Sequence, residues 1–420
     1  MHVMVLGAGI TGVTTAWFLH EAGFEVSVID RQFDAGQETS FANGGQISIS
    51  HPEPWANPCA PLTALSWLGR VGAPLRFVPR AHADQWQWAC RFLCECLPGR
   101  SRRNTAAIAA LAVYSLRKLH HVREAAGIAD AYDARAAGIL HLFFDPRPFA
   151  RARAKVEEFA RFGIEVRPCT REQCVDAEPA LAAVAPRLAG GLFAPNDESG
   201  DAMRFSMALA RVLADCRVQF HHGMTIEQLL VDDGRFARAM ATDSAGKRYA
   251  FTADACVVCL GSHGRELLRP LGENLPIFPL KGYSVTAPVI DHARAPTVSL
   301  TDEARRIVCS RLGERLRIAG TAELNDYNRD LDQARIRAML DWAEDRLPGA
   351  IARDQVTPWA GLRPATPGGV PIIGRSAYPN IWYNTGHGPL GWTLACGSAA
   401  ALVALMRGET PVLNFPFRRG

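Results

Sequence analysis

A glycine-rich turn near the start of the chain limits the possible folds more than any other feature. The apolar run 2–6 leads directly into Gly7-Ala-Gly9-Ile-Thr-Gly12, and a helix-like apolar stretch follows. Glycines at this spacing allow a tight turn, close approach of the backbone to a pyrophosphate, and close packing of helix on strand. The helix N-terminus then presents free N–H groups to the phosphates. The sequence therefore predicts a strand–turn–helix unit that binds a dinucleotide.

The next apolar run, residues 24–29, ends in Asp30, which stands eighteen residues after Gly12. A carboxylate at this distance is placed to accept hydrogen bonds from a ribose diol. It also disfavours a ribose 2′-phosphate, which argues against NADP. Asp30 does not distinguish FAD from NAD, so that choice depends on the rest of the chain.

Two further glycine-rich segments occur where a flavin would need close backbone approach. Asn-Gly-Gly-Gln at 43–46 follows the second predicted strand, and Gly-His-Gly-Pro-Leu-Gly at 386–391 precedes an apolar run. Small residues let N–H groups reach a diphosphate or a ring edge. A glycine loop that leads into a helix also directs the positive helix end toward an electron-rich group. An ordinary Asn-Gly turn is the alternative for 43–46, but together the segments favour FAD.

The composition argues against nucleic acid as a partner and against a disulfide framework. The 46 basic and 42 acidic residues give a net charge of only +4, with no dense block of Lys or Arg, so little surface could follow a phosphate backbone. The eleven cysteines are odd in number and scattered. We interpret the Cys90/Cys94/Cys96 and Cys256/Cys259 clusters as small buried residues in a reducing compartment, and we predict no metal site.

Two segments without charged residues, 1–20 and 376–406, have a composition similar to that of membrane-spanning helices. Glycines interrupt both, so we interpret them as buried elements of a nucleotide-binding fold and expect a cytoplasmic protein. The apolar stretch 55–78, with Arg70 and Arg76 in it, has the composition of an interfacial segment. It predicts contact with a partner surface or with the inner face of the cell membrane. A helix buried between domains is the alternative.

Three alternating segments in the middle of the chain predict a β-meander. They are residues 225–231, 236–243 and 248–252, and Asp-Asp-Gly and Ser-Ala-Gly turns separate them. A nucleotide-binding fold that is interrupted by a meander and resumes near the C-terminus predicts a discontinuous FAD-binding domain.

Six sequence blocks resemble, in order and spacing, the D-amino acid oxidase-like FAD-dependent oxidoreductase superfamily. Within it, the chain is most similar to the family of small, catalytic D-amino acid dehydrogenase subunits of bacteria, from residue 1 to about residue 412. The resemblance implies non-covalent FAD, oxidation of a D-amino acid to an imino acid by hydride transfer from Cα to flavin N5, and electron delivery to a quinone or another respiratory acceptor. The blocks are VMVLGAGITGVTTAWFL, ETSFANGGQIS, APNDESGD, PLKGYS, WAGLRPATPGGVPIIG and NTGHGPLGWTLACGSA.

The fold class that follows is α/β. We expect a Rossmann-like FAD-binding domain of the glutathione-reductase/D-amino acid oxidase type, and a smaller α+β domain with an antiparallel sheet that binds the substrate. A homo-oligomer or a partner subunit is compatible with the resemblance. We assign residues 1–85, 200–270 and 355–420 to the FAD-binding domain, and residues 86–199 and 271–354 to the substrate-binding domain.

Arg363 is the predicted carboxylate-binding residue. It lies in the motif Gly361-Leu-Arg-Pro364 and matches the arginine that binds the substrate carboxylate in the family. Guanidinium and carboxylate pair through two parallel hydrogen bonds, which fixes position as well as charge. An ordinary salt bridge is the alternative, since arginine makes up most of the 46 basic residues.

Three further residues are expected at the reacting centre. Tyr283 is expected to contact the carboxylate or the amine, or else to cap a backbone group. Lys281, inside an apolar strand, is expected either to bind the flavin N5/C4=O side through water or to extend to solvent. His387 is expected to hydrogen-bond the flavin or the backbone rather than to act as a base. From location alone, the substrate-pocket candidates are His51, Glu53 and Trp55.

The residues predicted to bind FAD belong to the glycine motifs and the segments beside them. The segment 51–55, Gly368 and Pro389 depart from the family's usual residues, which leaves the exact substrate open. The predicted FAD-binding residues are Gly7, Gly9, Ile10, Thr11, Gly12, Asp30, Arg31, Ser40, Asn43, Gly44, Gly45, Gln46, Thr225, Gly261, Gly386, His387, Gly388, Leu390, Gly391, Trp392 and Thr393.

Three other functions compete with a dehydrogenase that acts on D-amino acids, with cyclic ones such as D-proline or D-4-hydroxyproline among the candidates. A glycine or sarcosine oxidase-like enzyme would pass electrons to oxygen and form hydrogen peroxide. A tRNA-modifying flavoprotein would carry a methyltransferase domain and a larger basic surface, and the sequence shows neither. A non-catalytic FAD-binding subunit would not need Arg363.

Overall fold

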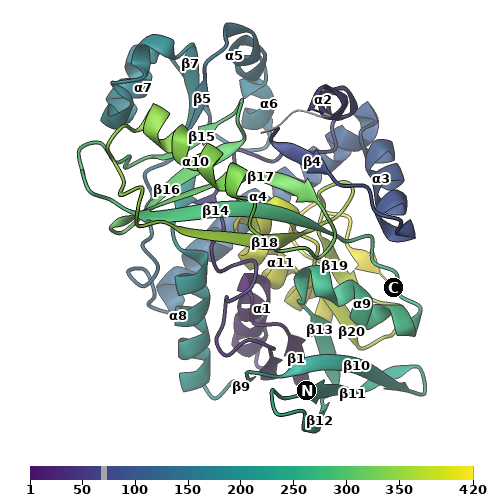
Figure 1. Cartoon of the computed structure of the whole chain (residues 1–420). Helices are drawn as coiled ribbons and strands as arrows, with labels where there is room; N and C mark the ends of the chain where they lie inside the picture. The colour runs from purple at the N-terminus through teal and green to yellow at the C-terminus, as the bar shows by residue number, and fades with distance from the viewer. Residues whose placement is uncertain (68–72, 420) are drawn as a thin grey trace.

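The computed structural model describes residues 1–67 and 73–419, and most of its strands belong to two large sheets, one above the other in Figure 1. The lower sheet has seven strands. Its strand β1 pairs in parallel with β2 and β13, and β13 pairs in parallel with β20. β19 pairs with β20 in the antiparallel direction. The strand order is β21 (Arg418–Arg419), β19 (Ile372–Arg375), β20 (Ile381–Thr385), β13 (Ala255–Val258), β1 (His2–Leu6), β2 (Glu25–Ile29) and β9 (Gln219–His221).

β1 and α1 (Ile10–Glu21) form the predicted strand–turn–helix unit, which the structure confirms. Val3 and Val5 belong to the apolar cluster on the helical side of the sheet, and Met4 and Leu6 to the cluster on the opposite side. A strand that is buried on both faces has apolar residues at successive positions. This double burial explains why the run 2–6 does not alternate.

Helices cover one face of the seven-stranded sheet. α1 packs against α8 (Ala202–Asp215) and α11 (Gly391–Met406), and α4 (Pro98–Ala125) packs against α11. A Cβ at Gly397 would lie 2.7 Å from the Cα of Ser115, so the glycine permits the close contact between α4 and α11. The Ser115 hydroxyl in turn accepts a hydrogen bond from the Gly397 N–H at 3.0 Å.

The predicted β-meander covers the other face of this sheet and is confirmed. β10 (Thr225–Asp232), β11 (Arg235–Thr242) and β12 (Arg248–Thr252) form an antiparallel three-stranded sheet. Leu229 and Phe236 of this meander join the cluster that contains Met4 and Leu6.

The upper sheet has nine strands and is mostly antiparallel, with parallel pairing between β5 and β15 and between β4 and β17. α10 (Gln333–Arg346) packs against β14 and β17. The strand order is β18 (Thr357–Ala365), β14 (Phe278–Pro288), β17 (Arg315–Leu324), β16 (Ile307–Leu312), β15 (Ser299–Asp302), β5 (Ile139–Phe143), β7 (Gly190–Ala194) and β6 (Arg167–Cys169), and β4 (Leu75–Phe77) pairs with β17.

Shorter elements complete the described chain. β3 (Gln46–Ile47) and β8 (Glu198–Ser199) form a two-stranded sheet. The remaining helices are α2 (Ala60–Trp67), α3 (Ala83–Glu95), α5 (Pro146–Arg153), α6 (Val156–Arg161), α7 (Arg171–Ala177) and α9 (Gly264–Leu268).

Two elements pack against a different layer from the one expected from the sequence. α4 lies in the segment 86–199 that was assigned to the substrate domain, yet its buried face packs on α11 because Leu111 and Leu119 belong to the core around α1. β18 lies in the segment 355–420 that was assigned to the FAD domain, yet it pairs with β14 along nine residues. The other boundaries stay predictions.

The apolar stretch near the C-terminus lies in the core. Among the described residues, Gly388–Met406 is the single helical stretch long and apolar enough to cross a membrane, and 67% of its most apolar window is buried inside the protein. Cys256 and Cys259 are buried as expected, whereas Cys90 and Cys94 of α3 are exposed, contrary to expectation. Their positions on the outer side of an amphipathic helix account for this difference.

Only part of the predicted interfacial segment 55–78 can be placed, because residues 68–72 lie outside the described residues. In α2, Leu62 is 73% exposed and Leu65 is 63% exposed. The contact of this segment with a membrane or a partner stays a prediction.

Candidate active site

A cavity of about 1400 Å³ lies between the two large sheets and contains most of the predicted site residues. Its walls come from the β1–α1 turn, the end of β2, the segment 38–60, strands β14, β17 and β18, and the loop before α11. Ligand pockets commonly have volumes of roughly 300–1,000 Å³. The cavity is therefore large enough for a dinucleotide together with a small substrate.

The β1–α1 turn forms a cradle for phosphates at one end of this cavity. Gly7 has φ +104°, and a Cβ at Gly12 would overlap the Gly7 carbonyl oxygen, so both positions require glycine. Gly9 precedes α1 in extended conformation and has no side chain to cap the helix, and among the first N–H groups that of Ile10 donates to Ser40 Oγ at 3.1 Å. Free N–H groups and the positive end of the helix dipole therefore face the cavity, as a pyrophosphate requires.

Asp30 lies at the end of β2 with a fixed carboxylate. Its two oxygens accept hydrogen bonds from the N–H groups of Ala8 and Gln32, at 2.6 and 2.7 Å. Burial raises the pKa of Asp30, and these hydrogen bonds oppose that rise. Because each carboxylate oxygen can accept more than one hydrogen bond, the group fits the predicted contact with ribose hydroxyls.

Almost all of the predicted FAD-binding residues line the cavity. Gly12 and Gly386 do not line it. Gly12 allows the helix to pack closely on the turn, and Gly386 has φ +80° and no room for a Cβ beside Thr366. Those that line it are Gly7, Gly9, Ile10, Thr11, Asp30, Arg31, Ser40, Asn43, Gly44, Gly45, Gln46, Thr225, Gly261, His387, Gly388, Leu390, Gly391, Trp392 and Thr393. The cradle, the acid and the size of the cavity all fit FAD.

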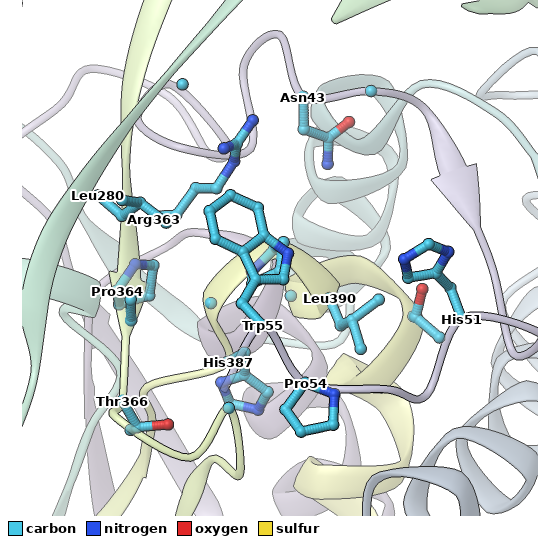
Figure 2. A pocket seen from close by; sticks show the side chains of 18 of the residues that line it. Asn43, His51, Pro54, Trp55, Leu280, Arg363, Pro364, Thr366, His387 and Leu390 are labelled. Atoms are coloured by element: carbon cyan, nitrogen blue, oxygen red, sulfur yellow. The ribbon is translucent and has the colours of Figure 1, made fainter. Parts of the chain in front are cut away.

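Arg363 projects from β18 into the same cavity (Figure 2). Its Nη1 donates to the carbonyl oxygen of Thr321 at 3.2 Å, and among residues 1–67 and 73–419 no carboxylate lies within 4.0 Å of the guanidinium. Loss of hydration lowers the pKa of Arg363 to about 10, so the group keeps its positive charge at neutral pH. The structure therefore holds a cation on the cavity wall without an internal counter-ion.

The backbone around Arg363 is shaped to accommodate the guanidinium. A Cβ at Gly282 in the neighbouring strand would overlap it. Thr321, whose carbonyl accepts the hydrogen bond, has φ +53°, an unfavourable conformation for a β-branched residue. It lies where the register between β14 and β17 shifts. Such irregularities concentrate at functional sites, and sequence analysis missed this one.

Tyr283 lines the cavity from β14, and its hydroxyl is buried without a hydrogen-bond partner among the described residues. Burial raises its pKa, so the hydroxyl keeps its proton. A buried hydroxyl without a partner is costly. The ring, however, packs in the core around α10, with Lys281 Nζ 4.9 Å and Arg335 Cζ 5.8 Å from its centroid. Successive side chains of a strand point to opposite faces, and it is Gly282 that faces Arg363. Contact of Tyr283 with the substrate therefore stays a prediction.

Lys281 does not reach the cavity, and both expectations for it are wrong. The side chain is 2% exposed, and Nζ lies 3.1 Å from Glu323 Oε2, 2.8 Å from Asn328 Oδ1 and 2.9 Å from the Asp330 carbonyl oxygen. Glu323 also pairs with Arg335, at 2.7 Å. The acid and the polar loop after β17 hold Lys281 in an internal ion network, away from both flavin and solvent.

His387 lines the cavity as a neutral imidazole. Ser398 Oγ donates to the Ala395 carbonyl oxygen, so the 2.9 Å contact between His387 Nε2 and Ser398 Oγ has Nε2–H as its donor. Nδ1 has no partner among the described residues. Burial lowers the pKa of His387 to about 3, which makes it a weak base near neutral pH. A hydrogen-bonding role is favoured.

The three substrate-pocket candidates all line the cavity. Trp55 is 37% exposed and lies between Arg363 and His387 in Figure 2. Glu53 pairs with Lys155. His51 lies beside His141 and Glu303, two residues that sequence analysis missed.

Comparison with known proteins identifies the family of the chain. The model of the DAO family, "FAD dependent oxidoreductase", matches residues 2–405. D-amino acid dehydrogenase from Dechloromonas aromatica is 48% identical over 419 residues and all of both chains. The enzyme of that name from Paramagnetospirillum magneticum is 45% identical over 99% of this chain and 97% of its own. The chain belongs to the DAO family and is an FAD-dependent oxidoreductase.

Solved structures share the fold at lower sequence identity. Glycine oxidase from Bacillus cereus has a TM-score of 0.70 at 19% identity, covering 97% of this chain and 95% of its own. L-proline dehydrogenase from P. horikoshii has a TM-score of 0.72 at 18% identity, covering 97% and 94%. These two structures support the fold assignment.

Proposed function

We propose that the protein is an FAD-dependent D-amino acid dehydrogenase, which oxidises a D-amino acid to the imino acid and passes the electrons to a quinone or another respiratory acceptor. The observation that carries the proposal is Arg363, a cation on the cavity wall that has no counter-ion within residues 1–67 and 73–419. An α-carboxylate is its natural partner, because the two groups pair bidentately. The names of the full-length relatives support the same substrate class.

The residues of the cavity supply position rather than acid–base chemistry. Bound FAD supplies the acceptor for the hydride that leaves the substrate Cα. Arg363 would hold the carboxylate through two parallel hydrogen bonds. With this end fixed, only one enantiomer directs its Cα–H toward the flavin while its side chain enters the pocket. Cyclic substrates such as D-proline and D-4-hydroxyproline satisfy the same requirement.

The test is anaerobic reduction of the bound flavin by a panel of D- and L-amino acids that includes both prolines. We expect D-amino acids to bleach the yellow flavin absorbance and their L-enantiomers to leave it unchanged. With a quinone analogue and air present, we expect the quinone to be reduced and little hydrogen peroxide to form. Bleaching by L-amino acids alone, or peroxide in amounts equal to the substrate consumed, would contradict the proposal.

We further propose that the protein is cytoplasmic and contacts the inner face of the membrane through α2. Leu62 and Leu65 are exposed on this helix, while Thr63 and Ala64 line the cavity. Membrane contact here would bring the cavity mouth close to a lipid-soluble quinone. We expect the holoprotein to float with anionic liposomes, and L62S/L65S to lose this binding. Wild-type protein that stays at the bottom of the gradient would rule out the membrane contact.

A further inference from the structure

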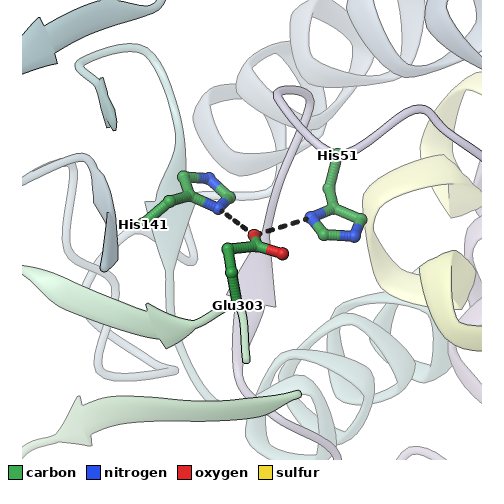
Figure 3. Close-up of side chains that lie close together, drawn as sticks. All are labelled: His51, His141 and Glu303. Atoms are coloured by element: carbon green, nitrogen blue, oxygen red, sulfur yellow. Dashed lines mark hydrogen bonds and ion pairs between the residues drawn. The ribbon is translucent and has the colours of Figure 1, made fainter. Parts of the chain in front are cut away.

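A polar cluster forms the part of the cavity wall around His51, and the proposed mechanism does not use it. His141 on β5, Glu303 after β15 and His51 converge there (Figure 3). His141 Nδ1 lies 2.9 Å from Glu303 Oε1, and His51 Nδ1 lies 3.9 Å from the same oxygen. The two imidazole rings stack with their centroids 5.9 Å apart.

Hydrogen bonds fix the orientation of the His141 ring. Ser50 Oγ donates to Asp197 Oδ2 at 2.5 Å and therefore accepts from His141 Nε2, 3.0 Å away. On the other side of the ring, Nδ1 faces the Glu303 carboxylate, whose pKa is lowered mainly by the hydrogen bond from His141. Both ring nitrogens thus face acceptors. His141 is therefore held between Glu303 on one side and Ser50 on the other.

His51 is held neutral by its surroundings. Burial lowers its pKa, and the neighbouring His141 adds to the effect. The carboxylates around it are already paired, since Glu303 Oε2 accepts from Arg306 at 2.8 Å and Glu53 binds Lys155. A neutral imidazole offers one N–H donor and one lone pair. His51 therefore adds hydrogen-bonding capacity to the wall without adding a charge.

The cluster is also held in place. Asp197 is fully buried and accepts hydrogen bonds from the N–H groups of Ile49 and Ser50, at 2.9 and 3.3 Å. These bonds fix the backbone immediately before His51. Figure 2 shows His51 and Arg363 on opposite sides of Trp55. A substrate anchored by Arg363 would thus direct its far end toward His51.

Resting on the proposed function, we infer that His51 forms a side-chain subsite for D-amino acids whose side chains carry an uncharged hydrogen-bonding group, a hydroxyl or an amide. Glu303 and His141 act as positioning residues, because the His141 ring stacks on His51 and Glu303 Oε1 lies 3.9 Å from His51 Nδ1. A charged side chain would have to compete with the existing Glu303–Arg306 and Glu53–Lys155 ion pairs. An aliphatic side chain would leave the imidazole without a partner.

The test compares isosteric substrates of the holoenzyme with a quinone analogue as acceptor. D-threonine differs from D-valine by a hydroxyl in place of a methyl, and D-asparagine differs from D-leucine by an amide in place of an isopropyl group. We expect kcat/KM to be about tenfold or more higher for the polar member of each pair, because a site that binds a polar group discriminates against its apolar analogue. D-aspartate and D-lysine should be slower than D-asparagine.

His51→Phe keeps a flat ring for stacking but removes both hydrogen-bonding atoms. We expect it to abolish the preference, so that kcat/KM becomes equal within about threefold for the two members of each substrate pair. His51→Gln, which restores a donor and an acceptor, should recover part of the preference. His292→Phe is the control, since His292 is exposed and does not line the cavity.

The outcomes separate the two proposals. Equal kcat/KM for D-valine and D-threonine in the wild type, or a preference that persists in His51→Phe, would overturn the subsite and leave the D-amino acid dehydrogenase proposal intact. Oxidation of none of the D-amino acids would overturn the proposed function, and the subsite with it.

Discussion

Arg363→Lys is expected to retain FAD and the fold but to lower kcat/KM for D-amino acids by about 10²-fold or more. The loss of one partner from a desolvated charge pair costs roughly 2–5 kcal/mol. An ammonium group keeps the charge but not the bidentate geometry. Steady-state kinetics with a quinone analogue measure the loss, and the flavin spectrum reports FAD content. Amino acid esters should lose their disadvantage relative to free acids in this variant.

Gly282→Ala tests the position of the Arg363 guanidinium from the neighbouring strand β14. Its Cβ would overlap the Arg363 guanidinium, and the flexible end of that side chain can move without unfolding the sheet. We expect a raised KM with FAD retained. Arg353→Lys is the matched control, because Arg353 pairs with Asp341 at the surface. Kinetics close to wild type in Arg363→Lys would remove the main reason for assigning an amino acid substrate.

Glu323→Gln is expected to cause the largest loss of stability, about 3–5 kcal/mol. Glu323 is buried between Lys281 and Arg335, at 3.1 and 2.7 Å. Removal of the carboxylate leaves two cations buried together without their common counter-ion. The free energy of unfolding of the holoprotein, from chemical denaturation at neutral pH, measures the effect.

An exposed ion pair provides the comparison for this variant. Glu165 and Arg167 are both solvent-accessible, and pairs of this kind contribute little to stability. We expect Glu165→Gln to leave the free energy of unfolding almost unchanged. The Lys281→Met/Glu323→Gln double variant should recover part of the stability lost in Glu323→Gln. A loss of under about 1 kcal/mol in Glu323→Gln would show that water reaches the two cations.

The cofactor cradle could be predicted because it is local in sequence. The turn at 7–12 and Asp30 lie within one strand–helix–strand unit, and glycine spacing determines their geometry. Arg363 could also be predicted, because it lies in the motif Gly361-Leu-Arg-Pro364. Both predictions depend on residues that are close together in the chain.

The cluster around His51 could not be predicted, because its members come from distant segments. His141 and Glu303 are 162 residues apart, and only the parallel pairing of β5 with β15 brings them together. No local spacing indicates that pairing. Asp197, which holds the backbone before His51, is also distant from both.

The partners of the buried Lys281 could not be predicted from the sequence either, for a different reason. A lysine within an apolar strand must have a partner or an exit to solvent, and the sequence indicates that need without identifying the solution. Glu323 is contributed by the neighbouring strand β17, and Asn328 by the loop that follows it. The packing of β14 against β17 and α10 therefore decided the position of the charge.

The location of the cavity between the two large sheets makes FAD a structural component as well as a reagent. The β1–α1 turn and β2 contribute one wall, and β14, β17 and β18 contribute another. A ligand that binds only the folded chain stabilises it by about 2.7 kcal/mol at a hundred times its Kd. We therefore expect the protein without FAD to unfold at a lower temperature than the holoprotein, so that scarcity of the cofactor weakens the fold as well as the activity.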